Sequence, residues 1–273
     1  MELAEATAPG VEGGADEVAR PLLSVDGVTI RFGGVTALQD VSFEVARGAI
    51  CGLIGPNGAG KTTLFNCVSR LYDPQSGSIR FEDRPLASVA RHEIAALGIA
   101  RTFQNVALFA TMTTRDNVRV GAHALARGGF LANALSNPLA RREERRVAER
   151  ADALIDEFGL QGVAEREVGR LPFAVQKRVE LARALASDPK VLLLDEWLAG
   201  LNPTELKTGI ALIEQLRVEG RTIIIVEHVM HAIRSLCDRC IVMNSGVKIA
   251  EGTPRDVLAN GEVIRAYLGE ADA

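Results

Sequence analysis

Nine residues in the first quarter of the chain combine glycines, a lysine and threonines at the spacing that phosphate binding requires. They read GPNGAGKTT over positions 55–63. Glycines there let the backbone bend and bring successive N–H groups close to phosphate oxygens. Lysine is expected to reach the β- and γ-phosphates, and the first threonine hydroxyl to help hold Mg²⁺. A nucleoside triphosphate site is therefore predicted, rather than a glycine-rich turn that binds nothing. Its predicted binding residues are Gly55, Asn57, Gly58, Gly60, Lys61, Thr62 and Thr63.

Two carboxylates much later in the chain can complete such a site. Asp195 and Glu196 directly follow the apolar run 191–194, which predicts a buried strand ending in acidic groups. We expect Asp195 to orient Mg²⁺ and Glu196 to polarise the attacking water. His228 follows a second apolar run, 222–226, and would lie near the γ-phosphate. Gln104 lies where the core meets a helical segment and would sense metal and water, which makes it a third candidate metal contact beside Thr62 and Asp195.

The pattern of elements around these residues predicts an α/β fold. The apolar run 50–54 reads as a strand and 62–71 as a helix, so the loop bridges strand to helix as its chemistry requires. From about residue 175 onward helices and strands alternate, which is typical of a parallel sheet covered by helices. Alternating segments at 22–32 and 41–45 predict antiparallel strands beside the loop.

Helical periodicity dominates the middle of the chain. Residues 102–171 are rich in Ala and Arg, and an apolar stripe with spacings of three and four predicts one long amphipathic helix. We expect the mixed charges RREERR on its other faces to be solvated rather than a docking surface. The stripe consists of Val147, Ala151, Leu154, Ile155 and Phe158.

Composition excludes several other classes of protein. The chain has 273 residues and a formal net charge of -4, from 31 basic and 35 acidic residues, so no nucleic-acid partner is expected. No apolar run approaches the ~18 residues that span a membrane. Residues 1–20 are acidic and lack a signal-peptide pattern, so we expect a disordered tail on a cytoplasmic protein. Four cysteines with one lone CxxC pair, Cys237 and Cys240, favour reduced structural thiols over a zinc or redox site.

Taken together, these motifs resemble the nucleotide-binding subunit of an ATP-binding cassette (ABC) transporter, over nearly the whole span 22–268. The resemblance implies a P-loop NTPase core with a mainly parallel sheet, an antiparallel β subdomain and a helical subdomain at about 105–175, within one cassette over 21–273. It makes 55–63 the Walker A loop, Gln104 the Q-loop, Asp195 and Glu196 the end of Walker B, 199–202 the D-loop and His228 the switch histidine. Phe32 would stack on adenine, although core packing also explains an aromatic ring. The implied signature residues are Leu171, Pro172, Phe173, Ala174, Val175 and Gln176.

Shorter segments look like the ATPases of branched-chain amino acid importers. They are ARTFQN (100–105), VELARAL (179–185), AGLNPTE (199–205), VEHVM (226–230) and AYLGE (266–270). The resemblance implies Mg²⁺-ATP hydrolysis at the cytoplasmic face of the membrane and two permease subunits. It also implies an extracytoplasmic binding protein and a second ATPase, either a different chain or a copy of this one. Each site would be completed by the partner's signature. Related ATPases of urea, amide or lipid systems, and a soluble nucleotide-gated clamp, are the alternatives.

Two positions depart from the family pattern. Ala174 stands where the subfamily usually has glycine, and its methyl group is expected to crowd the partner's nucleotide or to resist a positive φ. Trp197 stands where the family usually has proline, directly after Glu196. Packing under the D-loop or a contact across a dimer would each explain it.

Overall fold

The core of the molecule is a six-stranded sheet in the order β10-β9-β3-β8-β7-β6. The computed structural model describes residues 20–104, 106–123 and 138–268. The pairs from β9 through β6 are parallel, and β10 pairs antiparallel to β9. The strands are β3 (Ile50–Ile54), β6 (Ile99–Arg101), β7 (Val191–Asp195), β8 (Thr222–Val226), β9 (Arg239–Asn244) and β10 (Val247–Gly252).

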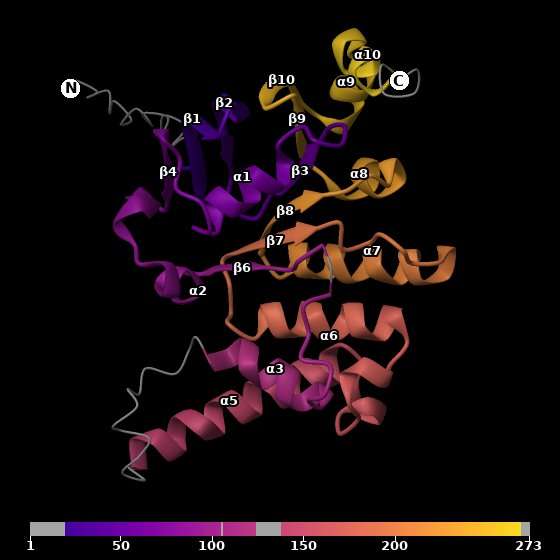
Figure 1. The fold of residues 1–273 in the computed structure, drawn as a ribbon. Coiled ribbons are helices and arrows are strands. Elements are labelled where there is room, and N and C mark those ends of the chain that lie inside the picture. The colour runs from indigo at the N-terminus through magenta and orange to yellow at the C-terminus, as the bar shows by residue number, and fades with distance from the viewer. Residues whose placement is uncertain (1–19, 105, 124–137, 269–273) are drawn as a thin grey trace, which may run out of the picture.

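Both faces of this sheet are buried, which explains why its central strands are apolar without alternation. In β7, Leu192 and Leu194 belong to one hydrophobic cluster, whereas Val191 and Leu193 belong to another on the opposite face. The first cluster includes residues of helices α6, α7 and α8, and the second includes α1 and a second sheet. The covering helices are α1 (Lys61–Val68), α6 (Phe173–Leu185), α7 (Pro203–Val218) and α8 (Met230–Leu236). Figure 1 shows α6 and α7 stacked below the sheet and α1 above β6 and β7.

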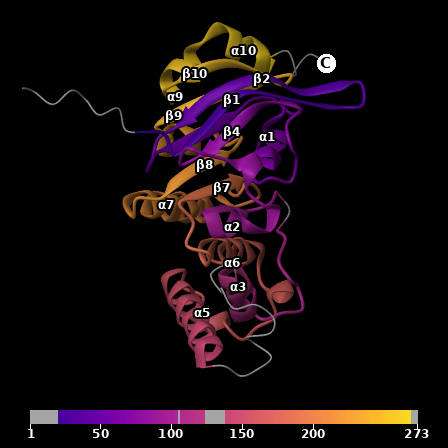
Figure 2. The same cartoon turned by 90° about the vertical axis from the view of Figure 1, so that its left-hand side faces the viewer.

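The second sheet is antiparallel, in the order β2-β1-β4-β5. It lies near the N-terminal end of the described chain, at the top in Figure 2. Its strands are β1 (Leu23–Phe32), β2 (Val35–Val45), β4 (Ser76–Phe81) and β5 (Arg84–Pro85). Short helical segments then lead to β6: η1 (Leu86–Ser88), η2 (Arg91–Glu93) and α2 (Ile94–Leu97).

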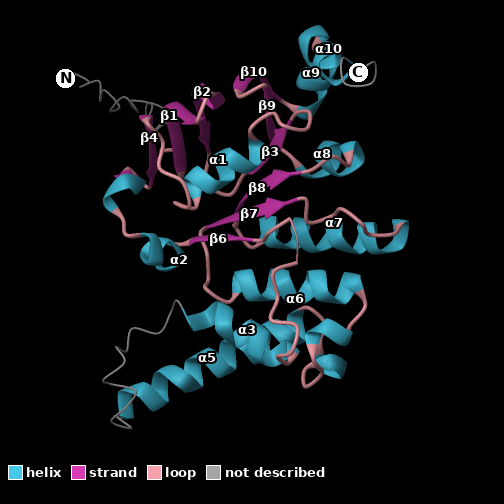
Figure 3. Ribbon diagram, viewed as in Figure 1, coloured by secondary structure: helices cyan, strands magenta, loops and turns pink. Residues whose placement is uncertain are grey.

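Helices α3 and α5 form a separate layer below α6, as the cyan ribbons of Figure 3 show. They are followed by two single turns, and the four segments are α3 (Thr114–Ala122), α5 (Pro138–Glu157), η4 (Gln161–Val163) and η5 (Val168–Arg170). The described part of the chain ends in α9 (Pro254–Ala259) and α10 (Gly261–Leu268). Helix α3 packs against α6 so closely that a Cβ on Gly121 would lie 1.9 Å from the carbonyl oxygen of Arg183.

Apart from the strand predicted at 41–45, the predicted strands and helices lie within a few residues of the observed ones, and the predicted α/β fold class is confirmed. The predicted apolar stripe of the long helix lies on and just beyond α5, where Ala151, Leu154, Ile155 and Phe158 are buried. The strand predicted at 41–45 is longer, because β2 begins at Val35 directly after the glycine turn. Of the predicted disordered tail, 1–19 lie outside the described residues. The domain boundaries remain a prediction.

Candidate functional site

The predicted phosphate-binding loop joins the end of β3 to the start of α1. Two of its glycines are required by close backbone approach as well as by their conformation. Gly55 has φ 150°, and a Cβ there would lie 2.0 Å from the carbonyl oxygen of Met243. Gly60 has φ 98°, and its Cβ would lie 2.6 Å from the carbonyl oxygen of Ala37. A side chain at either position would therefore displace the loop from β9 or β2.

Lys61 is the first residue of α1, and its side chain folds back under the loop. Its Nζ donates to the carbonyl oxygens of Gly55, at 2.5 Å, and Pro56, at 2.7 Å. The side chain is buried, so a cation is held inside the loop at the N-terminus of a helix, where backbone N–H groups also lack helical partners. A cavity of about 520 Å³ opens above it. The cavity is lined by Val35, Thr36, Ala37, Asn57, Gly58, Ala59, Gly60, Lys61, Thr62, Thr63, Gln104, Glu196 and Ser245.

Glu196, which lines this cavity together with Gln104, contacts both other predicted catalytic residues. Gln104 Nε2 donates to Glu196 Oε2 at 3.0 Å, and His228 Nε2 lies 2.9 Å from Glu196 Oε1. Glu196 also has a left-handed backbone, with φ 49°, which is strained for a residue other than glycine. Three segments that are remote in sequence thus meet at one carboxylate beside the phosphate-binding loop.

Asp195 lies deeper, at the end of β7, and is paired with Arg101. Arg101 Nη2 donates to Asp195 Oδ2 at 2.7 Å, and both side chains are almost fully buried. Burial raises the pKa of Asp195, and the hydrogen bond from Arg101 opposes that shift. The other oxygen, Asp195 Oδ1, is buried with no hydrogen-bond partner in the described part of the chain. An unpaired buried carboxylate oxygen next to this cavity fits a role in holding a divalent cation.

Arg101 is a residue whose place in the site the sequence analysis missed. Besides Asp195, its guanidinium binds Asn66 Oδ1 at 2.6 Å and lies 5.5 Å and 5.2 Å from the ring centroids of Phe65 and Phe103. It therefore ties the helix after the phosphate loop to the end of β7. An arginine directly after the apolar residues Ile99 and Ala100 is the one signal in the sequence that could have pointed to a buried partner.

Phe32 lies at the end of β1, and 45% of it is exposed. Its ring meets Tyr72 edge to face, with centroids 5.1 Å apart. The alternative that Phe32 simply fills the core is therefore wrong. An exposed ring supported by a second aromatic ring remains available for stacking.

The predicted signature residues lie away from the phosphate loop, at the start of α6. Pro172 caps this helix, and Gln176 Nε2 donates to the carbonyl oxygen of Leu171 at 2.8 Å. Ala174 lies in the first turn of α6 and is not among the residues with positive φ. The expectation that Ala174 resists a positive φ is thus wrong, because a right-handed helical position suits alanine. Crowding by its methyl group remains a prediction.

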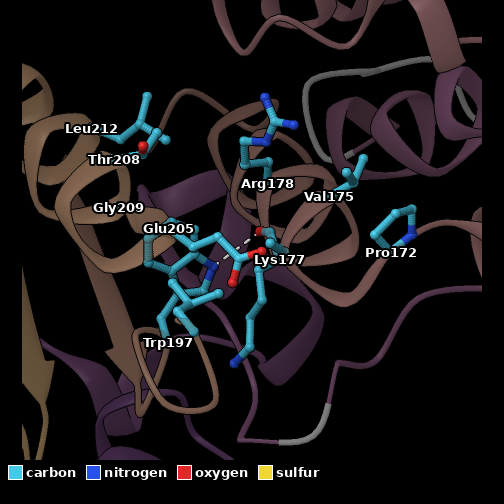
Figure 4. Close-up of a pocket in the computed structure, with 11 residues that line it drawn as sticks. Pro172, Val175, Lys177, Arg178, Trp197, Glu205, Thr208, Gly209 and Leu212 are labelled. Atoms are coloured by element: carbon cyan, nitrogen blue, oxygen red, sulfur yellow. Dashed lines mark hydrogen bonds between the residues drawn. The ribbon is translucent and has the colours of Figure 1, made fainter. Parts of the chain in front are cut away.

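A second cavity, of about 310 Å³, lies beside these residues between α6 and α7 (Figure 4). It is lined by Pro172, Ala174, Val175, Lys177, Arg178, Trp197, Leu201, Glu205, Thr208, Gly209 and Leu212. Trp197 is buried, as expected for packing under the D-loop, and its indole Nε1 donates to the carbonyl oxygen of Lys177 at 3.0 Å. A Cβ on Gly209 of α7 would lie 3.3 Å from the Trp197 indole and 2.7 Å from Leu198. The absence of a side chain at Gly209 therefore leaves room for both residues against α7.

The four cysteines are free and buried, in agreement with the prediction of structural thiols. Burial raises the pKa of both Cys51 and Cys67 to about 12, which leaves these thiols protonated. Among the described residues no group of His, Cys, Asp or Glu side chains forms a metal cluster. No helix in that part of the chain is long and apolar enough to cross a membrane.

Comparison with known proteins gives consistent matches. Residues 38–199 match the ABC transporter family, and residues 247–273 match a family described as branched-chain amino acid ATP-binding cassette transporter. The chain is 42% identical to the high-affinity branched-chain amino acid transport ATP-binding proteins BraF of Pseudomonas aeruginosa and LivG of Escherichia coli. In both cases 93% of this chain and 100% of the relative are covered. A solved ATP-binding cassette of an ABC transporter in its ADP conformation superimposes with a TM-score of 0.79 and 30% identity, covering 92% of this chain and 99% of that one.

Proposed function

The chain belongs to the ABC transporter family of ATP-binding cassettes, and we propose that it powers the uptake of branched-chain amino acids through separate permease subunits. It is an ATPase, as the family is. The observation that carries the choice of cargo is the match of residues 247–273 to the branched-chain amino acid cassette family. The names of relatives that span nearly the whole chain support the same cargo.

In the proposed reaction Glu196 acts as the general base toward the water that attacks the γ-phosphate. Its two carboxylate oxygens are already occupied by Gln104 and His228, which hold it at the edge of the cavity. Those two contacts restrict the carboxylate to one orientation, and positioning of this kind is a large part of phosphoryl-transfer catalysis.

Lys61 and the backbone of the loop are proposed to bind the triphosphate. The buried ammonium and the N-terminal N–H groups of α1 supply positive charge where the phosphates would lie. Phe32 would stack on the adenine. Thr62, Gln104 and Asp195 would hold Mg²⁺, which supplies charge neutralisation at the phosphates when bound. The unpaired Asp195 Oδ1 supports that assignment.

The proposed partners follow from the family. Two permease subunits and an extracytoplasmic binding protein would complete the importer, with this chain bound peripherally at the cytoplasmic face of the membrane. A second ATPase, identical or different, would contribute its own signature to the site at Lys61. The segment around 104–117, with the exposed ring of Phe109, is the proposed contact with a permease.

The test begins by isolating the assembled complex. Tagged Glu196→Gln protein would be purified from detergent-solubilised membranes, and the co-purifying proteins identified by mass spectrometry. Two permeases and a second ATPase are expected. Recovery without any membrane protein would contradict the proposal and favour a soluble clamp.

Cargo is tested with the wild-type complex in proteoliposomes that contain ATP. Uptake of radiolabelled leucine, in the presence of the binding protein, should depend on ATP and disappear in Lys61→Ala. Uptake of urea instead of leucine, or movement of a labelled lipid, would contradict the proposed cargo while leaving the ATPase assignment intact.

A further inference from the structure

Three charged side chains are buried near the backbone of the site residues, and the proposed reaction does not use them. Lys177 and Glu180 lie on α6 and Glu227 follows β8; we call these residues the α6 ion cluster. Each is 1% exposed. Burial lowers the pKa of Lys177 and raises that of Glu227 to about 7, which reflects the free energy that desolvating these charges costs. Buried ion pairs often stabilise a protein no more than apolar residues of similar volume do, so the cluster is weak evidence for a role in stability alone.

Lys177 contacts the backbone of the proposed catalytic base. Its Nζ lies 3.3 Å from the carbonyl oxygen of Glu196 and 5.3 Å from the centre of the Phe173 ring. The same carbonyl accepts the N–H of Ala199 at 3.1 Å, and the N–H of Glu196 donates to the carbonyl oxygen of Val226 at 2.8 Å. The left-handed conformation of Glu196 costs free energy, and these hydrogen bonds help to offset that cost.

The two glutamates of the cluster reach the segments that carry the other site residues. Glu180 Oε1 accepts the N–H of Phe103 at 3.2 Å, and Phe103 directly precedes Gln104. Glu227 Oε1 accepts the N–H of Leu198 at 2.7 Å, and Glu227 directly precedes His228. The cluster therefore connects α6 to the three segments that carry Gln104, Glu196 and His228. The side chains of these three residues meet at the Glu196 carboxylate.

We propose that Lys177 is a positioning residue that fixes the backbone of Glu196 and couples the position of α6 to the orientation of that carboxylate. This inference rests on the proposed function, because it takes Glu196 as the base and the start of α6 as the surface that closes the partner's nucleotide site. Figure 4 shows the Lys177 side chain extending from α6 past Trp197, whose indole is bonded to the same residue's carbonyl. A shift of α6 on meeting the partner's nucleotide moves Lys177 Nζ, and with it the carbonyl of Glu196. Hydrolysis at Lys61 then depends on whether the other site is filled.

The first test compares variants of Lys177 in the assembled complex. Lys177→Met keeps the length of the side chain but removes its charge and donors. We expect kcat for ATP hydrolysis to fall about 10- to 100-fold, because the base is misplaced, while KM for ATP changes less than about twofold. Lys177→Arg, which can still donate to the carbonyl, should recover most of kcat. The matched control, Lys190→Met, removes an exposed lysine that pairs with Glu82 and should leave kcat unchanged. Wild-type kcat in Lys177→Met would overturn the proposal.

A double variant separates positioning from charge balance. Lys177→Met leaves two buried carboxylates without their cation, so Lys177→Met/Glu227→Gln should unfold at a higher temperature than the single variant. If Lys177 positions Glu196, kcat stays low in the double variant although stability returns. Recovery of kcat together with stability would overturn the proposal, since the lysine would then serve only to balance charge. Should the single variant fail to fold, the double variant alone decides between these outcomes.

Glu196→Gln in the same complex distinguishes failure of this inference from failure of the proposed function. Normal turnover in Glu196→Gln would remove Glu196 from the role of base, and the inference would fall with it. Slow turnover in Glu196→Gln with normal turnover in Lys177→Met would overturn the inference alone.

Discussion

Single side chains at this site have more than one partner each, and Glu196 is the clearest example. Its carboxylate meets Gln104 and His228, while its backbone meets Val226, Ala199 and Lys177. The strained φ of Glu196 is stable only because neighbours on several elements hold both ends of the residue. Roles at the residue scale can therefore be separated by variants that change one contact at a time.

Lys61 and Glu196 should separate binding from chemistry. Lys61→Ala removes the cation under the loop, so affinity for ATP should fall by about tenfold or more, as expected for loss of a charge-assisted contact. Glu196→Gln keeps a side chain of the same shape, so ATP should still bind, while turnover falls by roughly 10²- to 10⁴-fold. Nucleotide titration of the purified chain and a phosphate-release assay on the assembled complex measure the two effects. Unchanged affinity in Lys61→Ala would contradict the loop assignment.

Arg101 should be essential for stability. Arg101→Leu leaves Asp195 buried without its partner and removes the contacts with Phe65 and Phe103, so the free energy of unfolding should fall by about 3–5 kcal/mol. Urea denaturation followed by circular dichroism measures this. Arg47→Leu, which breaks an exposed pair with Glu82, should cost less than about 1 kcal/mol. Equal losses of unfolding free energy in the two variants would contradict this prediction, because the buried pair would then stabilise the protein no more than the exposed pair does.

At the scale of elements, α6 is the helix that joins the most parts of the site. Its start carries the signature residues, its first turns carry Lys177 and Glu180, and its far half packs against α3 at Gly121. Helix α7 begins beside it with a capping box, in which Asn202 accepts the N–H of Glu205 and Glu205 accepts the N–H of Asn202. The first turns of both helices line the cavity of Figure 4, and only that of α7 is fixed by a side-chain cap.

Replacing Ala174 by glycine should raise turnover of the assembled complex several-fold, because it removes a methyl group from the first turn of α6 that faces the partner's nucleotide in the proposed dimer. The same change should cost up to about 1 kcal/mol of stability through lower helix propensity. Ala184→Gly, farther along α6, is the matched control, with a similar loss of stability and no gain in turnover. Unchanged turnover in Ala174→Gly would mean that the alanine is harmless.

At the scale of the whole molecule, the central sheet is buried on both faces by two separate hydrophobic clusters. The site lies at the carboxyl ends of β3 and β7, where the strands deliver the phosphate loop and the two acidic residues to one edge. Burying the α6 ion cluster near that edge costs free energy, and it makes the free energy of unfolding depend on pH.

Glu227 should contribute to that dependence. Burial raises its pKa from 4.5 to about 7, so the folded state binds a proton more tightly than the unfolded state does. The contribution to stability is present below pH 4.5, declines as pH rises through about 7, and amounts to on the order of 3 kcal/mol in total. Urea denaturation at several pH values should show a smaller decline over this interval in Glu227→Gln than in wild type. Glu44→Gln, at an exposed position, should leave the decline unchanged, and an unchanged decline in Glu227→Gln would contradict the prediction.

Local sequence alone was enough to predict the phosphate loop, its flanking strand and helix, and most other elements. These depend on contacts between near neighbours: glycines where the backbone must bend, apolar runs for buried strands, and a 3.6-residue stripe for α5. The order of the motifs along the chain was also sufficient to identify the family. Such features can be read from sequence because their physical causes act over a few residues.

Only the tertiary structure decided which side chains share a partner. The pairing of Arg101 with Asp195 and the contact of Lys177 with the Glu196 carbonyl join segments that are 94 and 19 residues apart. Buried charges cannot be predicted from local pattern, because whether a lysine in an amphipathic helix is solvated or buried depends on what packs over it. Trp197 is similar, since its indole packs where Gly209 of α7 leaves room for it.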